Sequence, residues 1–250
     1  VFLAGDAAHL MPPFAGQGMN GGMKDASNLA WKLVAVVRGL APDAILDTYE
    51  VERAPIVRRM VEVSRRLGAV IMPTNRLAAA ARDSLFGCLN LSSRFRAFIG
   101  RGGVVPAPAI HRSALTGGDR DALIGQMAPQ PTVSAGQGAS PLDRFLGCHQ
   151  WLALGVVVDP ATMMSSRDLA ILEALGARFI CLNGQARSAG TLSVSCDDPA
   201  FADWARRRDV RAVLVRPDRF IAARLASGRD LEVLQPFAAA LTAADARVAA

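Results

Sequence analysis

The chain has 250 residues, of which 51% are hydrophobic and 20% are charged, and this composition excludes a disordered or collagen-like protein. The net charge of +6 suggests nucleic acid as a partner, but across residues 50–66 arginines alternate with glutamates, and the chain has one tyrosine. Such alternation is typical of solvated helix faces, so we expect no nucleic-acid binding. No segment reaches the roughly 20 apolar residues of a membrane span, so we expect no membrane partner.

The N-terminal stretch predicts a strand, a glycine-rich turn and a helix, in that order. Residues 1–4 are an apolar run that favours a strand and ends at Gly5 and Asp6. Four glycines follow: Gly16, Gly18, Gly21 and Gly22. From residue 23 to residue 40, apolar residues recur every three or four positions, which predicts an amphipathic helix. Free N–H groups at a helix start and a nearby acid suit a nucleotide-like cofactor, with the acid accepting from a sugar hydroxyl. Taken alone, the glycines fit a surface loop equally well.

Two more helices are predicted before residue 100. Residues 47–67 form an amphipathic stretch with Pro55 near its start, and residues 75–89 form an alanine-rich one. Glycines and prolines then interrupt the periodicity, and we interpret residues 101–137 as a linker.

The last part of the chain alternates between strand and helix patterns. The predicted strands are residues 150–158, 178–182, 211–216 and 219–223, and the predicted helices are residues 166–175, 201–207 and 231–243. This order predicts a small thioredoxin-like α/β domain. The four cysteines include no CxxC pair, so we expect reduced thiols, no dithiol exchange and a structural or interface role for this domain. The three scattered histidines give no metal-ligand spacing, and no metal site is predicted.

A family resemblance rests on the N-terminal motifs. GDAAH, PP, GQGMN and DASNLAWKL, in this order within residues 5–33, resemble the second FAD-binding motif of the flavoprotein aromatic hydroxylases, single-component monooxygenases of the para-hydroxybenzoate hydroxylase type. VERAPIVRRMVEVSRRLGAVIMPTNRLAAAARD, residues 51–83, looks most like the 3-(3-hydroxyphenyl)propionate hydroxylases. The resemblance implies an α/β fold in which residues 1–100 are the C-terminal, helical part of a Rossmann-like FAD-binding domain and residues 138–250 are the thioredoxin-like domain.

The resemblance also implies which residues face FAD: Gly5, Asp6, Pro13, Gly16, Gly18, Met19 and Asn20. Asp6 is expected on the ribityl or ribose hydroxyls. The backbone at Pro13 is expected beside the reacting edge of the isoalloxazine ring, as the candidate catalytic environment. The turn that ends at Asn20 is expected to present backbone amides that stabilise negative charge on the reduced flavin. We interpret His9 as a packing or capping residue rather than a proton carrier.

The implied activity is the ortho-hydroxylation of a phenolic compound resembling 3-hydroxyphenylpropionate, with FAD, NAD(P)H as co-substrate, O2 and a flavin C4a-hydroperoxide. A cytoplasmic location and, as in some members, a homodimer through the C-terminal domain are also implied. No strand followed by GxGxxG occurs, so we expect the chain to be the C-terminal portion of a longer protein, and FAD binding by the chain alone stays open. The alternatives are a non-catalytic interaction or dimerisation module and a flavin oxidoreductase of other chemistry, such as a halogenase or epoxidase.

Overall fold

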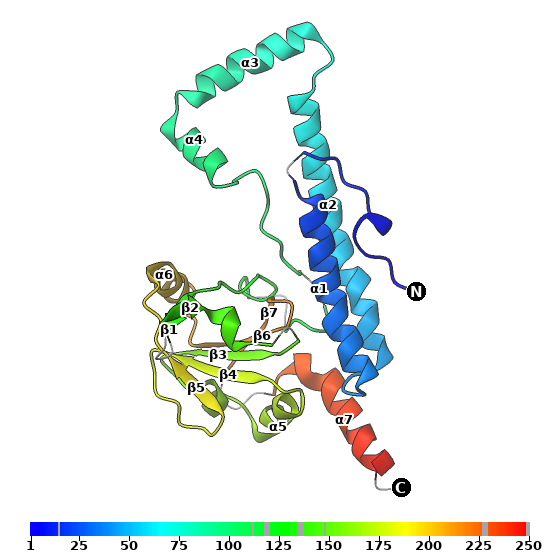
Figure 1. Cartoon of the computed structure of the whole chain (residues 1–250), viewed down its shortest axis with the longest axis vertical. Coiled ribbons are helices and arrows are strands. Elements are labelled where there is room, and N and C mark those ends of the chain that lie inside the picture. The colour runs from blue at the N-terminus through cyan, green and yellow to red at the C-terminus, as the bar shows by residue number, and fades with distance from the viewer. Residues whose placement is uncertain are drawn as a thin grey trace. The chain divides into compact units, whose positions relative to one another are not determined.

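The computed structural model describes residues 1–14, 16–111, 113–117, 121–134, 138–147, 149–226 and 230–248, with side chains as far as residue 243. Its elements are labelled in Figure 1. The chain divides into two compact units. The first unit combines Val1–Ala26 with Arg53–Pro108, and the second combines Ser27–Glu52 with Ala109–Ala250. The division falls inside two helices, so each of them contributes residues to both units.

The first unit is helical. Its elements are the 3-10 helix η1 (Gly5–Ala7), the first part of α1 (Gly18–Val37), most of α2 (Thr48–Ile71), α3 (Arg76–Asn90) and α4 (Ser93–Gly100). Asn75 caps α3 by accepting hydrogen bonds from the amides of Leu77 and Ala78, and Ser92 caps α4. The structure confirms the helices predicted over residues 47–67 and 75–89.

The strand predicted over residues 1–4 is wrong. Ala4 has an extended backbone, but none of the described strands pairs with this segment, and η1 follows it directly. A β-favouring sequence forms a strand only when a neighbouring strand accepts and donates its backbone hydrogen bonds.

The second unit is built on a five-stranded sheet. Its strands are β3 (Leu152–Val156), β4 (Arg178–Leu182), β5 (Thr191–Val194), β6 (Ala212–Val215) and β7 (Ile221–Arg224). They lie in the order β5-β4-β3-β6-β7, with β3, β4 and β5 parallel and with β6 and β7 joined by antiparallel pairing. The helices α5 (Ser166–Ala174), α6 (Pro199–Arg207) and α7 (Gln235–Val248) belong to the same unit. A separate two-stranded antiparallel sheet is formed by β1 (Thr132–Ser134) and β2 (Ala139–Pro141).

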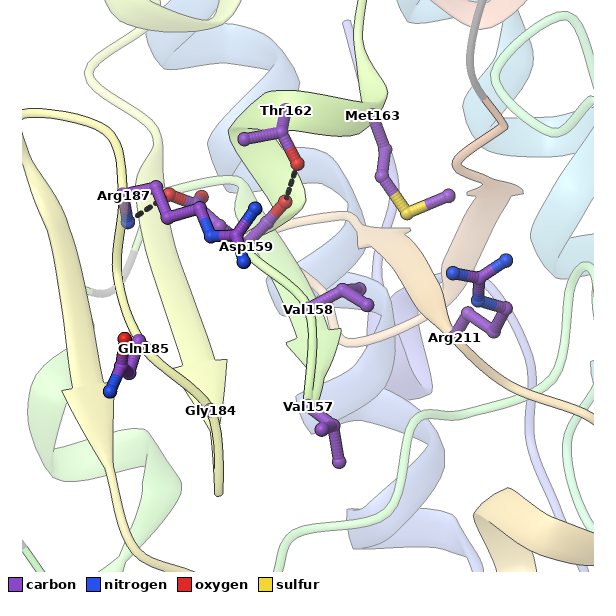
Figure 2. Close-up of a pocket in the computed structure, with 9 residues that line it drawn as sticks. All are labelled: Val157, Val158, Asp159, Thr162, Met163, Gly184, Gln185, Arg187 and Arg211. Atoms are coloured by element: carbon purple, nitrogen blue, oxygen red, sulfur yellow. Dashed lines mark hydrogen bonds between the residues drawn. The ribbon is translucent and has the colours of Figure 1, made fainter.

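Both faces of this sheet are buried. Ala153 of β3 joins a hydrophobic cluster with Leu172 of α5 and Phe237 of α7, whereas Leu154 joins a second cluster with Phe201 of α6. Successive residues of a strand point to opposite faces, so α5 and α7 cover one face and α6 covers the other (Figure 1). A pocket of about 540 Å³ lies beyond the carboxyl ends of β3 and β4 (Figure 2). The strands and helices predicted for residues 150–243 occur in the predicted order, but β5 was not predicted.

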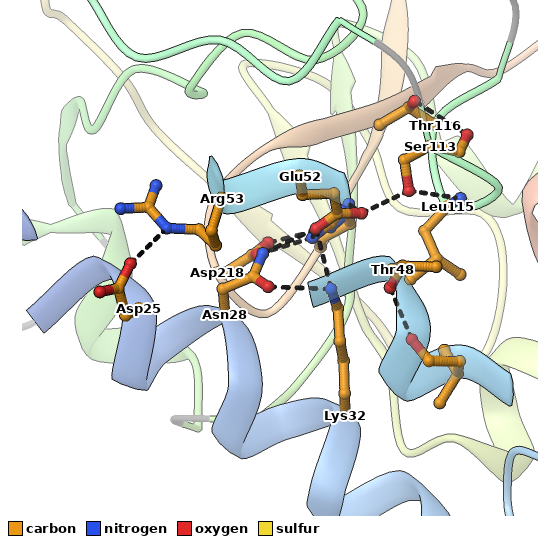
Figure 3. Close-up of polar contacts among 12 residues, drawn as sticks. Asp25, Asn28, Lys32, Thr48, Glu52, Arg53, Ser113, Leu115, Thr116 and Asp218 are labelled. Carbon is orange, nitrogen blue, oxygen red and sulfur yellow. Dashed lines mark hydrogen bonds and ion pairs between the residues drawn. The ribbon is translucent and has the colours of Figure 1, made fainter. Parts of the chain in front are cut away.

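A buried group of charges joins the helices of the second unit to its sheet. Arg216, after β6, donates to both oxygens of Glu52 on α2 at 2.7 Å and also pairs with Asp218 at 2.6 Å. Lys32 on α1 lies 2.9 Å from Glu52. Asn28 donates to Glu52 at 2.7 Å and to Asp218 at 2.8 Å (Figure 3). These five residues, which we call the buried network, are all below one-tenth exposed.

The buried network balances its charges, with two bases facing two acids. Burial raises the pKa of Glu52, but the charges of Arg216 and Lys32 and the hydrogen bonds that Glu52 accepts lower it to about 2. Burial lowers the pKa of Lys32 to about 8, against the effect of Glu52. Burial also disfavours charged Arg216, yet Asp218 and Glu52 raise its pKa. Glu52 and Arg216 therefore stay ionised inside the protein at neutral pH.

Part of the segment between the two predicted domains covers the edge strand β7. The amide of Gly117 donates to the carbonyl of Ala222 at 2.7 Å, and the amide of Gly125 donates to that of Ile221 at 2.8 Å. Leu115 in the same segment is fully buried. These bonds satisfy backbone groups of β7 that would otherwise be exposed at the edge of the sheet.

Gly125 provides a test of this packing. Its φ is +78°, and an added Cβ would lie 1.8 Å from the carbonyl oxygen of Ile110. We expect Gly125→Ala to lower the free energy of unfolding by about 2–3 kcal/mol more than Gly176→Ala, because of this overlap. Gly176 is the matched control, since its φ is +67° and an added Cβ meets no atom within 4 Å. Urea unfolding followed by circular dichroism measures both variants, and equal losses would contradict the packing.

Candidate functional site

The segment that leads from Gly5 to α1, which we call the glycine-rich turn, includes η1 and Gly16. Its beginning at Gly5 packs against the start of α1 within the first unit. Gly5 has a φ of +59°, and a Cβ added to Gly22 would lie 3.2 Å from the Cα of Gly5. The two backbones approach so closely that side chains at these positions would separate them. Gly16 also has a positive φ, +60°, and its amide donates to the carbonyl of Pro13 at 3.3 Å. The turn is thus defined by its backbone rather than loosely exposed.

Asp25 on α1 ties this turn to both helices. Its carboxylate accepts hydrogen bonds from the amide of Gly5 at 3.0 Å and from Arg53 Nε on α2 at 2.8 Å, and His9 Nε2 lies 2.6 Å away. Only 1% of Asp25 is exposed. Burial by itself raises the pKa of Asp25, but the hydrogen bonds from Arg53, His9 and Gly5 outweigh it and hold this pKa below its ordinary value.

Ser64 and Gly68 on α2 hold the stretch around Pro13. The hydroxyl of Ser64 lies 2.6 Å from the carbonyl oxygen of Pro12 and 2.5 Å from that of Phe14, and its one proton can be donated to either of them, so Ser64 anchors the residues before and after Pro13. The Phe14 ring fills the space where a side chain at residue 68 would be, since a Cβ there would lie 2.5 Å from it. Pro13 itself stays exposed between these two anchors.

The predicted FAD-facing residues all lie in the first unit, on η1, on the following turn and on the first turn of α1. Asp6 is exposed, and so is 76% of Met19. A Cβ added to Gly16 or Gly18 meets no atom within 4 Å, so the backbone is open to a ligand there. The amide of Gly21 donates to the carbonyl of Gln17 at 2.8 Å in the first turn of α1. Helix geometry leaves the amides before it, up to Asn20, without helical acceptors.

This geometry fits a flavin cofactor. The open backbone, the positive end of a 20-residue helix and the exposed carboxylate of Asp6 provide donors for a polar ring edge and an acceptor for sugar hydroxyls. Two buried nitrogens beside the turn, Nδ1 of His9 and Nη1 of Arg53, have no hydrogen-bond partner within the part of the chain that the structure describes. Unpaired buried nitrogens are expected where a further polar group binds.

Sequence reasoning missed the three residues that brace the turn: Asp25, Arg53 and Ser64. Asp25 lies inside the DASNLAWKL motif and Arg53 inside VERAP, but neither residue's contact was inferred. A charged residue on the inner side of an otherwise apolar helix pattern is the signal that could have identified Asp25 and Arg53, whereas Ser64 gives no such signal. His9, interpreted as a packing or capping residue, contacts Asp25.

Comparisons with known proteins show which families and solved structures the chain resembles. Residues 1–64 match the FAD binding domain family, and residues 125–240 match the HcaD C-terminal domain family. The solved structure of OxyS, an anhydrotetracycline hydroxylase from Streptomyces rimosus, is 27% identical with a TM-score of 0.64, and the match covers 94% of this chain and 44% of OxyS. PieE, a flavin-dependent monooxygenase solved with FAD and substrate, is 25% identical with a TM-score of 0.64, over 97% of this chain and 47% of PieE. The chain therefore resembles FAD-dependent aromatic hydroxylases over the part of their length that it covers.

Within that class, the chain resembles the 3-(3-hydroxy-phenyl)propionate/3-hydroxycinnamic acid hydroxylases. The enzyme of Burkholderia cenocepacia is 37% identical over 89% of this chain and 43% of its own length. The enzyme of Klebsiella pneumoniae is 35% identical over 97% of this chain and 44% of its own length. The subfamily resemblance seen in residues 51–83 is confirmed. The chain thus spans less than half the length of these curated relatives.

No helix in the described part of the chain is long and apolar enough to cross a membrane. The described residues also hold no group of three or more histidine, cysteine, aspartate or glutamate residues that could bind a metal ion. Cys88, Cys181 and Cys196 are free thiols, and Cys148 lies outside the described residues.

The bracing role of Asp25 predicts a pH dependence. We expect Asp25→Asn to lower the free energy of unfolding by about 3 kcal/mol at pH 7, because buried Arg53 loses its counter-charge. A carboxylate with a lowered folded pKa stabilises the protein fully above its unfolded pKa of about 3.9 and loses that contribution as the pH falls through the folded value. The difference between wild type and variant should therefore shrink below about pH 4.

Urea unfolding between pH 3 and pH 7 measures this difference. Asp43→Asn is the control, because Asp43 is exposed on the 3-10 helix η2 (Asp43–Asp47). A difference between wild type and Asp25→Asn that stays constant over this range would contradict the bracing role of the carboxylate.

Proposed function

We propose that these residues form the flavin-facing part of an FAD-dependent monooxygenase that hydroxylates a phenolic acid resembling 3-hydroxyphenylpropionate. Oxygen enters ortho to the phenol hydroxyl, NAD(P)H is the reductant and O2 is the oxygen source. The names of the curated relatives support the substrate class, and the match of residues 1–64 to the FAD binding domain supports the cofactor. Because NAD(P)H is a cytoplasmic reductant, the proposal includes a cytoplasmic location.

One observation carries the proposal: a glycine turn, braced by buried Asp25, leads into the open N-terminus of α1. Bound FAD would supply the activation of oxygen. The amides of Gly18, Met19 and Asn20 would hold the pyrimidine edge of the ring, where preorganised donors stabilise negative charge. Asp6 would accept from ribityl or ribose hydroxyls. With Gly5 and Gly16 shaping the turn, the backbone at Pro13 would border the reacting edge and help to keep water away from it.

The domain proposal assigns residues 1–100 to the FAD-binding domain, residues 101–137 to a linker and residues 138–250 to a thioredoxin-like domain. The neighbouring strands β4, β3, β6 and β7, with the helices α5, α6 and α7 between or after them, support that likeness. Burial raises the pKa of both Cys181 and Cys196, which argues against thiol chemistry at these two residues. We assign this domain a structural role, including contact between the subunits of a homodimer.

Product analysis tests the reaction. The protein, expressed from its complete reading frame, is supplied with NADH, labelled O2 and 3-(3-hydroxyphenyl)propionate. We expect one labelled oxygen on the ring carbon next to the phenol hydroxyl. Peroxide formation without a labelled product would contradict the proposal, and a halogenated or epoxidised product would favour the other flavin chemistries.

A binding measurement tests the residue roles separately. We expect Asp6→Ala to weaken FAD binding by about tenfold, because it removes an acceptor worth about 1–2 kcal/mol. Asp43→Ala is the control, as another exposed aspartate at a 3-10 helix. Fluorescence titration of FAD measures both affinities, and equal affinities would contradict the role of Asp6.

A further inference from the structure

The pocket in the second unit lies at the edge where the parallel strands end. β3 ends at Val156 and β4 at Leu182, and residues 157–163 and 184–187 that follow them supply most of the lining. β6 runs antiparallel to β3, so Arg211, which precedes β6, reaches the same edge. In open α/β sheets, the carboxyl ends of parallel strands are the usual place for a ligand.

The acid in the pocket is already satisfied. Asp159 accepts hydrogen bonds from the amides of Arg187 and Ser188, both at 2.7 Å, and from Ala161 N and Thr191 Oγ1, both at 3.0 Å. Burial raises the pKa of Asp159, but these bonds hold it below its ordinary value. Its carboxylate is therefore a structural acceptor that fixes the wall of the pocket, with little capacity left for a ligand.

The bases in the pocket, by contrast, are available. The guanidinium groups of Arg187 and Arg211 form no hydrogen bond or ion pair with any other residue that the structure describes. Figure 2 shows these two side chains on either side of Val158. Two exposed arginines and one aspartate, whose oxygens already accept hydrogen bonds, leave a net positive charge at this end of the sheet, which favours an anion.

The rest of the lining combines the polar side chains of Thr162 and Gln185 with an apolar part that is held in place by its backbone. Val157, Val158 and Met163 contribute hydrocarbon surface. Val157 has a φ of +65°, a strained conformation for a β-branched residue, and its amide is held by the carbonyl of Leu182 at 2.7 Å. A Cβ at Gly184 would lie 2.5 Å from the carbonyl oxygen of Val157, so glycine is needed there. The lining is thus preorganised before any ligand arrives.

We propose that this pocket binds a small organic acid, with its carboxylate attracted by the unpaired guanidinium groups of Arg187 and Arg211 and its apolar body against Val157, Val158 and Met163. The volume of about 540 Å³ falls in the usual range for small-molecule sites. An arylalkanoate combines the required charge with an apolar body. The site belongs to the second unit, its residues are separate from the flavin-facing turn, and binding requires no flavin.

Calorimetric titration of the whole chain with 3-phenylpropionate, without FAD, tests the proposal. We expect one saturable site, weakened about tenfold in the double variant Arg187→Gln/Arg211→Gln, because two charge-assisted hydrogen bonds are lost. Arg178→Gln is the matched control, since Arg178 is exposed at the start of β4, the opposite end of that strand. Circular dichroism checks that each variant is folded.

Three outcomes would overturn the proposal. The first is that binding of 3-phenylpropionate does not saturate up to about 10 mM. The second is that the double variant binds it with unchanged affinity. The third is that inorganic phosphate binds as tightly as 3-phenylpropionate, which would show that the apolar surface plays no role. A neutral analogue, 3-phenylpropanol, should bind at least about tenfold more weakly than the acid. Because FAD is absent, failure here leaves the proposed hydroxylation intact, and failure of the hydroxylation leaves this site intact.

Discussion

The buried network is the constraint on which the second unit depends. Removing charges from water is costly, and only close pairing and full hydrogen bonding offset that cost. Glu52 meets this requirement by accepting from Arg216, Lys32 and Asn28, while Asp218 provides the second negative charge. Glu52 and Arg216 are 164 positions apart in the chain. The contacts can form only when α1, α2 and the β6–β7 turn all have their native places, so the network selects one arrangement of these elements.

Two consecutive residues of α2, Glu52 and Arg53, form ion pairs with different buried partners. Glu52 takes part in the buried network of the second unit, and Arg53 pairs with Asp25 in the first. On α1, Asp25 holds the amide of Gly5, and Asn28, one turn later, donates to Glu52. The glycine-rich turn is therefore not an isolated loop. Its geometry depends on α1 and α2, which carry the charged residues Asp25 and Arg53 on their buried faces. Such faces are apolar in most helices.

Prediction from sequence succeeded where the signal was local or motif-based. The periodicity of residues 47–67 and 75–89 predicts their helices, and the short apolar runs near residues 152 and 178 predict central strands. β5 was missed because its residues Leu192 and Ser193 are exposed and give no apolar run. The motif drew attention to the glycine-rich turn before α1, but not to the contacts that brace it. Those contacts pair residues that are distant in the chain, such as Ser64 with the carbonyl of Pro12, and a single sequence contains no record of such pairs.

A double-mutant cycle on Glu52 and Arg216 tests the central claim most directly. The free energy of unfolding is measured by urea at pH 7 for wild type, Glu52→Gln, Arg216→Met and the double variant. If the buried network holds the helices to the sheet, each single variant leaves an unpaired buried charge. The free energy of unfolding lost in the double variant should then be at least about 2 kcal/mol smaller than the sum of the losses in the two single variants. Losses that add to within about 0.5 kcal/mol would contradict the account.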